Sequence, residues 1–154
     1  GRPVQDRRCG GMREFTQKAP LPVEVLKGLM AEARGARDKA YAPYSGFPVG
    51  AAVLSGDGVV FRACNVENGS YGLSVCAERN AVSMLVASGR VNPVAIAVAG
   101  PPGVPCTPCG ACRQVLAEFN PSMAVVLEDG KGGLEVVSLE DLFPRPFQLG
   151  ESRG

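Results

Sequence analysis

Three cysteines and one glutamate form the most specific chemical pattern in this chain of 154 residues. Glu78 follows Cys76 by two positions, and Cys109 and Cys112 form a C-x-x-C pair further along the chain. Three thiolates suit a zinc ion, which accepts sulfur ligands in tetrahedral geometry. Three protein ligands leave the fourth position to water, as in catalytic zinc sites. A carboxylate at Glu78 could then move protons to and from that water.

The absence of histidine excludes several common kinds of catalytic and metal-binding site. The chain has six cysteines but no histidine and no tryptophan, and its net charge is +1. Without histidine there can be no Ser-His-Asp triad, no Cys-His dyad and no imidazole metal ligand. A net charge near zero gives no general field for nucleic acid or an anionic membrane, so we expect neither as a partner.

Length and composition predict one domain, over residues 21–154. Apolar residues make up 45% of the chain and charged residues 20%, as in ordinary globular proteins. Residues 1–20 hold five basic side chains and lack the apolar stretch of a secretory signal, so we interpret them as a mobile basic arm. We therefore expect a cytoplasmic protein with free thiols and no membrane span.

Helices and strands must bring the two cysteine motifs together. Apolar residues at helical spacing predict three helices, over 22–41, 76–88 and 110–119. Short apolar runs predict five strands, over 49–54, 59–64, 94–99, 123–127 and 134–137. Asp57-Gly58 predicts a hairpin turn, and residues 138–141 resemble a capping box that opens a single helical turn. The order predicts an α/β fold, a three-layer α-β-α sandwich whose mixed five-stranded sheet has helices on both faces.

The cysteines fall at the beginnings of two predicted helices. Cys76 precedes one helix, and Cys109 and Cys112 bracket the first residues of another. Because both helices flank one central strand, we expect their N-termini to converge. Zn²⁺ with three thiolates carries one net negative charge, which the partial positive charge of each helix N-terminus offsets.

These motifs resemble the cytidine deaminase family, specifically its small homotetrameric zinc-dependent class. Residues 76–78 (Cys-Ala-Glu) and 108–112 (Pro-Cys-Gly-Ala-Cys) match the zinc deaminase signature, in which the first ligand is His or Cys. The similarity extends from about residue 40 to 147 and includes four further segments, 42–45, 47–52, 64–68 and 113–115. Without histidine, the chain can only be of the all-cysteine kind.

The resemblance implies an enzyme with one Zn²⁺ per chain, held by Cys76, Cys109 and Cys112. Its reaction would be the hydrolytic deamination of cytidine and 2′-deoxycytidine to uridine and 2′-deoxyuridine, with release of ammonia. Zinc-bound hydroxide would attack C4 of the base while Glu78 acts as proton shuttle. The role implied for such an enzyme is pyrimidine salvage.

The resemblance also assigns residues that touch the nucleoside. Asn65 and Glu67 would bind the ribose hydroxyls, and Phe47 would pack on the pyrimidine. Ala77 would contribute a backbone group to the edge of the base. The partner is therefore expected to be a small nucleoside.

Four further residues would act from outside the bound nucleoside. Tyr71 and Phe147 would reach into the site of a neighbouring subunit, which implies a homotetramer with sites at subunit interfaces. Arg79 and Arg113 would donate hydrogen bonds to the thiolates. Such bonds withdraw electron density from sulfur and so favour ionisation of the metal-bound water.

Other kinds of protein remain open on these residues. Cys106, Cys109 and Cys112 form C-x-x-C-x-x-C, which also occurs in iron–sulfur proteins. A structural zinc site could use Cys106 or Cys64 as fourth ligand. A blasticidin S-type deaminase of nucleoside antibiotics would share the zinc motif, although residues 65–68 (Asn-Val-Glu-Asn) favour plain cytidine. A nucleic-acid editor would need a basic channel that this composition does not supply.

Overall fold

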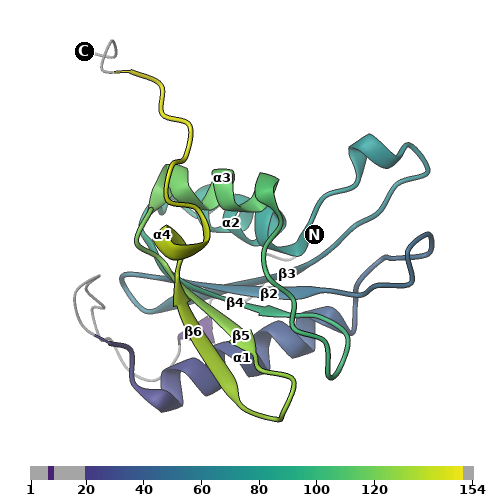
Figure 1. Ribbon diagram of the computed structural model, residues 1–154, viewed down its shortest axis with the longest axis horizontal. Helices are drawn as coiled ribbons and strands as arrows, with labels where there is room; N and C mark the ends of the chain where they lie inside the picture. The colour runs from purple at the N-terminus through teal and green to yellow at the C-terminus, as the bar shows by residue number, and fades with distance from the viewer. Residues whose placement is uncertain (1–6, 9–19, 151–154) are drawn as a thin grey trace.

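The computed structural model describes residues 7–8 and 20–150, and a mixed six-stranded sheet forms its middle layer (Figure 1). Only β4 and β5 are parallel, and every other neighbouring pair is antiparallel. Across the sheet the strands are β1 (Arg7–Arg8), β3 (Val59–Cys64), β2 (Gly50–Ser55), β4 (Pro93–Ala99), β5 (Ala124–Glu128) and β6 (Leu134–Ser138). The five predicted strands and the mixed sheet are confirmed.

The sixth strand, β1, was not predicted. Its two residues pair with Val59 and Val60 on the outer edge of β3. The mobile arm expected over residues 1–20 otherwise lies almost entirely outside the described residues. The structure therefore shows that one short piece of this basic segment has a partner in the sheet.

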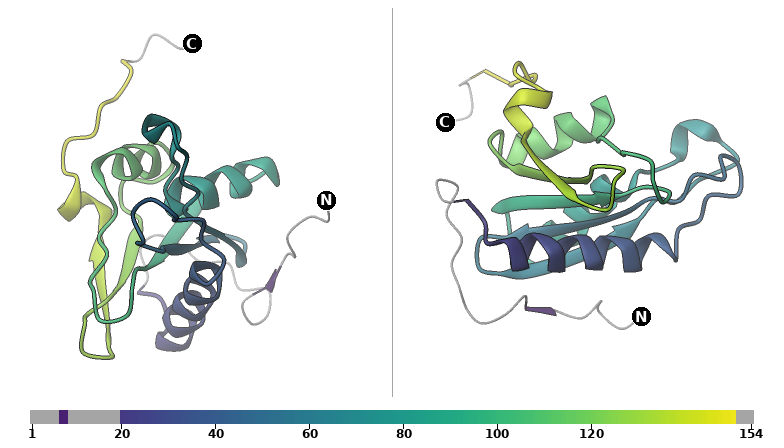
Figure 2. Two further views of the ribbon diagram at one scale, coloured as in Figure 1. Left: turned by 90° about the vertical axis from the view of Figure 1, so that its right-hand side faces the viewer. Right: turned by 60° about the horizontal axis from the view of Figure 1, so that its bottom comes forward.

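Helices cover both faces of the sheet, as the three-layer prediction requires (Figure 2). One face carries α1 (Val23–Arg37). The other face carries α2 (Ala77–Ala87), α3 (Gly110–Phe119) and the short α4 (Leu139–Leu142). None of the helices in the described part has the length and apolar character needed to span a membrane.

Alternating side chains of the central strands fill both cores. Ala51 and Val53 of β2 belong to the cluster under α2 and α3, while Ala52 and Leu54 belong to the cluster under α1. All six residues of β2 and all seven of β4 are buried. Burial on two faces explains why these strands are continuous apolar runs rather than alternating ones.

Gly50 allows α1 to lie unusually close to the sheet. A Cβ atom at this position would lie 1.9 Å from the carbonyl oxygen of Ala33 in α1, which no side chain can tolerate. In the register of the sheet, Gly50 pairs with Cys64 on one side and with Ala99 on the other. The loops that lead to the two cysteine motifs therefore leave the sheet at the same end.

Candidate metal centre and active site

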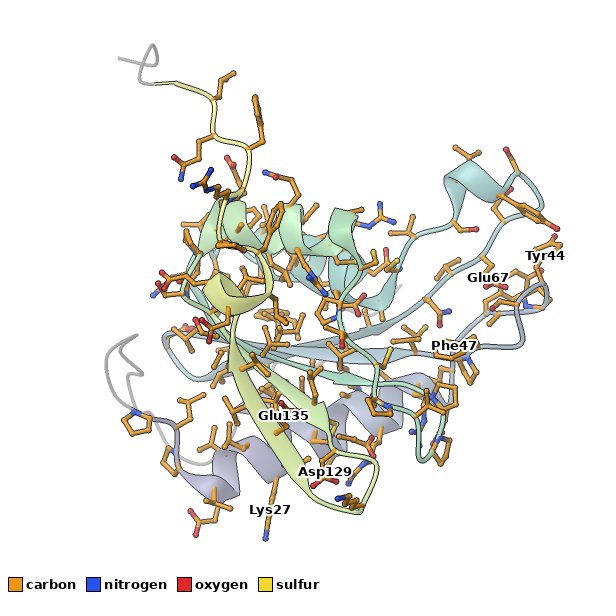
Figure 3. All side chains as sticks on the ribbon, in the orientation of Figure 1. Lys27, Tyr44, Phe47, Glu67, Asp129 and Glu135 are labelled. Atoms are coloured by element: carbon orange, nitrogen blue, oxygen red, sulfur yellow. The ribbon has the colours of Figure 1, made fainter. Side chains whose placement is uncertain are left out.

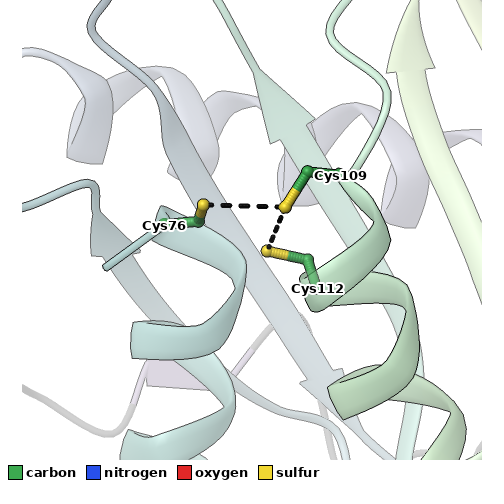
Figure 4. Close-up of side chains that lie close together, drawn as sticks. All are labelled: Cys76, Cys109 and Cys112. Carbon is green, nitrogen blue, oxygen red and sulfur yellow. Dashed lines mark hydrogen bonds between the residues drawn. The ribbon is translucent and has the colours of Figure 1, made fainter. Parts of the chain in front are cut away.

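The three motif cysteines meet where two helices begin (Figure 4). Cys76 is the N-cap of α2 and Cys109 is the N-cap of α3, while Cys112 lies in the first turn of α3. The Sγ atom of Cys109 lies 3.8 Å from that of Cys76 and 3.5 Å from that of Cys112. Within the described residues this is the only group of three His, Cys, Asp or Glu side chains placed to share a metal ion.

These distances fit zinc. Tetrahedral zinc with Zn–S bonds of about 2.3 Å places its sulfur ligands about 3.8 Å apart. Cys64 and Cys106 do not belong to the group, so the described residues offer three sulfur ligands rather than four. Cys112 is fully buried and Cys109 is exposed, so solvent reaches one side of the cluster. This is the donor set of a catalytic zinc site.

The ionisation of the cluster also calls for a cation. The pKa of the Cys76 thiol is lowered to about 5, first by a hydrogen bond from Cys112 and then by the Arg79 guanidinium. The same hydrogen bond to Cys76, together with burial, raises the pKa of Cys112. Three sulfurs at this spacing cannot all ionise unless a positive ion shares them, and a divalent metal supplies that charge.

Arg79 lies beside the cluster, as predicted from the resemblance. Its Nη2 atom is 3.7 Å from the Sγ atom of Cys76 and 3.5 Å from the carbonyl oxygen of Ser74. The hydrogen bond to Cys76 raises the pKa of Arg79, so the guanidinium remains charged. Its Nε atom is the only buried side-chain nitrogen or oxygen in the described part of the chain without a hydrogen-bond partner. One donor is therefore still unused next to the sulfurs.

Glu78 is the only acidic side chain buried in the described part of the chain. It is 4% exposed, and its Oε2 atom accepts a hydrogen bond from the Cys112 thiol at 3.3 Å. Burial raises the pKa of Glu78 above its ordinary value. A carboxyl group whose pKa is shifted toward neutrality can both take up and return a proton. Its position next to the metal ligands suits that role.

Asn65 and Glu67 lie in the loop after β3 and bond to the loop that precedes β2. The Asn65 Oδ1 atom accepts from the backbone N–H of Val49 at 2.9 Å, and its Nδ2 atom donates to the carbonyl of Phe47 at 3.0 Å. The Glu67 carboxylate accepts from the backbone N–H groups of Tyr44 and Ser45 at 3.0 and 3.1 Å. Tyr44, Phe47 and Glu67 accordingly gather at one end of the molecule (Figure 3).

Backbone pairing connects this loop to the metal ligands. Val66 exchanges two hydrogen bonds with Val75, at 3.0 and 2.9 Å, and Cys76 follows directly. On its other side, Val66 forms a bridge with Tyr41. The Asn80 side chain, one turn into α2, donates to the carbonyl of Cys64 at 3.0 Å. Asn65 and Glu67 are thus fixed relative to α2, and no motif in the sequence points to Asn80.

The remaining residues assigned to the nucleoside differ in exposure. Phe47 lies beside Tyr44 and Glu67 at one end of the molecule (Figure 3) and is 40% exposed, whereas Ala77 is buried in the first turn of α2. Tyr71, in the short helix η1 (Tyr71–Leu73), and Phe147 are 77% and 70% exposed. The ring of Tyr71 meets Tyr44 edge to face, with centroids 5.9 Å apart. The two most exposed aromatics therefore face outward.

Arg113 differs from the expectation that it bonds to a thiolate. Its Nε atom donates to the carbonyl of Pro108 at 2.8 Å, and its Nη1 atom donates to the carbonyl of Leu142 at 2.7 Å. Next to it, the Gln114 side chain exchanges two hydrogen bonds of 3.0 Å with the backbone of Phe147. The two side chains hold the segment after α4 against α3, so Arg113 braces the loop that carries Cys109.

Known proteins resemble this chain in sequence and in fold. Residues 23–128 match the family model described as the cytidine and deoxycytidylate deaminase zinc-binding region. The chain is 48% identical over 123 residues to the cytidine deaminase of Sporosarcina psychrophila, covering 79% of this chain and 90% of that protein. The crystal structure of cytidine deaminase from Burkholderia pseudomallei matches with 50% identity and a TM-score of 0.74, covering 79% of this chain and 98% of that one. The structure from Mycobacterium leprae matches with 40% identity and a TM-score of 0.69, covering 77% and 97%.

Proposed function

Because the chain belongs to the cytidine and deoxycytidylate deaminase family, we propose that it deaminates both cytidine and 2′-deoxycytidine, in pyrimidine salvage. Its class is that of a zinc-dependent hydrolase acting on a C–N bond. The observation that carries the proposal is the meeting of three thiols, at the spacing zinc requires, with the buried carboxyl group of Glu78. The products are uridine, or 2′-deoxyuridine, and ammonia.

In the proposed mechanism, Glu78 moves both protons of one water molecule. Zinc held by Cys76, Cys109 and Cys112 supplies the Lewis acidity that makes water nucleophilic near neutral pH. As oxygen adds to C4 of the base, Glu78 takes the first proton and delivers it to N3. Glu78 then takes the second proton and delivers it to the amino group, which leaves as ammonia. The carboxylate ends as it began, and its raised pKa suits both transfers.

We assign recognition of the nucleoside to the two loops that Asn65 and Glu67 join. The Glu67 carboxylate accepts hydrogen bonds from ribose hydroxyls, and the Asn65 amide assists it. Phe47 packs against the pyrimidine, and the backbone of Ala77 binds the edge of the base. The exposure of Phe47 and the fixed position of Glu67 support these assignments. A phosphate on the sugar would be repelled by Glu67.

We further propose that residues 21–154 assemble as a homotetramer whose sites lie at subunit interfaces. Tyr71 and Phe147 project from the subunit and supply an aromatic surface to a neighbour. Tyr44 and Leu73 extend that surface beside Tyr71, and they are 53% and 66% exposed. A contiguous group of exposed large apolar side chains is typical of a protein interface.

The proposal is tested by a substrate panel. Ultraviolet absorbance should fall when the protein is mixed with cytidine or 2′-deoxycytidine, and should stay constant with cytidine monophosphate and blasticidin S. Release of ammonia should be absent with single-stranded DNA. Turnover of blasticidin S but not cytidine would replace the proposed substrate with a nucleoside antibiotic. A brown protein with iron and no turnover would favour an iron–sulfur function.

A further inference from the structure

Ser45 lies at a junction of hydrogen bonds between the two nucleoside-binding loops. Its Oγ atom donates to the Oε2 atom of Glu67 at 2.5 Å and accepts from the backbone N–H of Phe47 at 3.0 Å. Its own backbone N–H donates to Oε1 of the same carboxylate at 3.1 Å. One small residue thus contacts both the group assigned to the sugar and the residue assigned to the base.

These bonds hold the half-buried Glu67 carboxylate in one orientation. Glu67 receives three donors from residues 44 and 45, two on Oε1 and one on Oε2. The Ser45 hydroxyl is the first cause of the lowered pKa of Glu67. An ionised carboxylate accepts hydrogen bonds but cannot donate them. With Oε1 occupied twice, Oε2 keeps an acceptor position for a hydroxyl group.

Phe47 does not depend on Ser45 to the same degree. Asn65 holds the carbonyl of Phe47 and the N–H of Val49, so two bonds to this loop remain if the Ser45 hydroxyl is removed. Glu67, by contrast, would lose its only hydrogen bond on Oε2 among the described residues. Removal of the Ser45 hydroxyl should therefore affect Glu67, which is assigned to the sugar, more than Phe47, which is assigned to the base.

We propose that Ser45 is a positioning residue that orients the Glu67 carboxylate toward the nucleoside sugar and makes the enzyme selective for substrates with sugar hydroxyls. This inference rests on the proposed function, in which Glu67 binds those hydroxyls. Ser45 acts through Glu67 and takes no part in the proton transfers of Glu78.

The test compares Ser45→Ala with Ser45→Thr in the zinc-loaded enzyme, using cytidine and 2′,3′-dideoxycytidine. For Ser45→Ala, KM for cytidine should rise about tenfold, as expected for one lost hydrogen bond to a charged group, with little change in kcat. KM for the dideoxynucleoside should change less than about twofold, because it lacks the 2′- and 3′-hydroxyl groups that cytidine offers to Glu67. Ser45→Thr keeps the hydroxyl and should keep the wild-type KM.

A double-mutant cycle shows whether Ser45 acts through Glu67. Adding Ser45→Ala to Glu67→Gln should raise KM for cytidine no further than Glu67→Gln alone, since the shared interaction is already lost. Additive losses, equal losses on both nucleosides, or an impaired Ser45→Thr variant would each overturn the inference while leaving deamination intact. A wild-type enzyme that fails to turn over cytidine would instead overturn the proposed function.

Discussion

At the scale of single residues, the zinc site has to stabilise the negative charge of three neighbouring thiolates. Three thiolates and Zn²⁺ leave one net negative charge, which would make bound water a weaker acid. Arg79 stands 3.7 Å from Cys76 and has a further buried donor without a partner. We propose that Arg79 withdraws charge from sulfur and does not hold the metal.

We expect Arg79→Ala to keep its zinc and lose turnover. The three cysteine ligands are unchanged, so metal content should stay at about one zinc per chain. Loss of a hydrogen bond to a metal ligand typically lowers activity about 10- to 100-fold. Zinc by plasma mass spectrometry and kcat on cytidine, measured on the same preparation, check both parts. Arg34→Ala, on α1 and paired with Glu128, is the matched control. A wild-type rate for Arg79→Ala would contradict the proposal that Arg79 withdraws charge from the sulfur ligands.

The spacing of residues in the sequence was sufficient to predict that the short side chains of the site lie close together. Cys76, Cys109 and Cys112 have little conformational freedom, so helix N-termini that converge bring their sulfurs together. Arg113 could not be predicted in this way, because the atoms that a long side chain reaches depend on the fold. Its acceptor at Leu142 belongs to α4, which no local pattern places beside α3.

At the scale of elements, the site depends on where strands end and helices begin. β3 and β4 terminate at the same end of the sheet, on either side of Gly50. Apolar periodicity predicted α3 at its observed bounds and α2 to within one residue. It missed β1 and η1, which are too short to show a period. The helical turn predicted at Ser138 is present as α4, but the capping box is wrong, since the Ser138 side chain makes no capping hydrogen bond.

The hairpin between β2 and β3 gives a pH-dependent prediction. Asp57 accepts hydrogen bonds from the Ser55 hydroxyl and from Nε of Arg90, and its pKa is lowered from 3.8, first by Ser55 and also by Arg90. A lowered pKa in the folded state contributes stability above the unfolded-state pKa, and this is lost as the pH falls through the folded-state value. The stabilisation should therefore be full at neutral pH and disappear in acid.

Asp57→Asn should lower the free energy of unfolding at pH 7 by about 0.5 kcal/mol, a small value because the pair is partly exposed. At about pH 3, below the unfolded-state pKa of 3.8, the difference from the wild type should begin to shrink, because the stabilisation is lost as the pH falls through the lowered folded-state pKa of Asp57. Urea denaturation at the two pH values measures the change. An equal difference at both would mean that the Asp57 charge is not the cause.

At the scale of the whole molecule, the α-β-α architecture, the family, the enzyme class and the zinc cofactor were all predicted from sequence and are confirmed. The oligomeric state could not be predicted in the same way, because the sequence of one chain does not identify which exposed apolar side chains contact another copy. Tyr71 and Phe147 are outward in the subunit, and only a partner can show what they contact.

Shared sites predict that two inactive variants can rescue each other. Glu78→Gln removes the proton shuttle of its own subunit, and Tyr71→Ala removes the group proposed to complete a neighbour's site. Co-expressed with different tags and purified through both, mixed tetramers should regain about a quarter of the wild-type activity, the share of sites with both residues intact. If mixed assemblies are no more active than the average of the two variants, the sites are not shared.

The most direct test measures zinc content and cytidine turnover on the same samples of wild-type enzyme and Glu78→Gln. We predict about one zinc in each, loss of ultraviolet absorbance with the wild type, and a rate lower by a factor on the order of 10²–10⁴ for the variant. A Glu78→Gln protein that has lost its zinc would make Glu78 a structural residue. One that keeps both its zinc and the wild-type rate would contradict its role as proton shuttle.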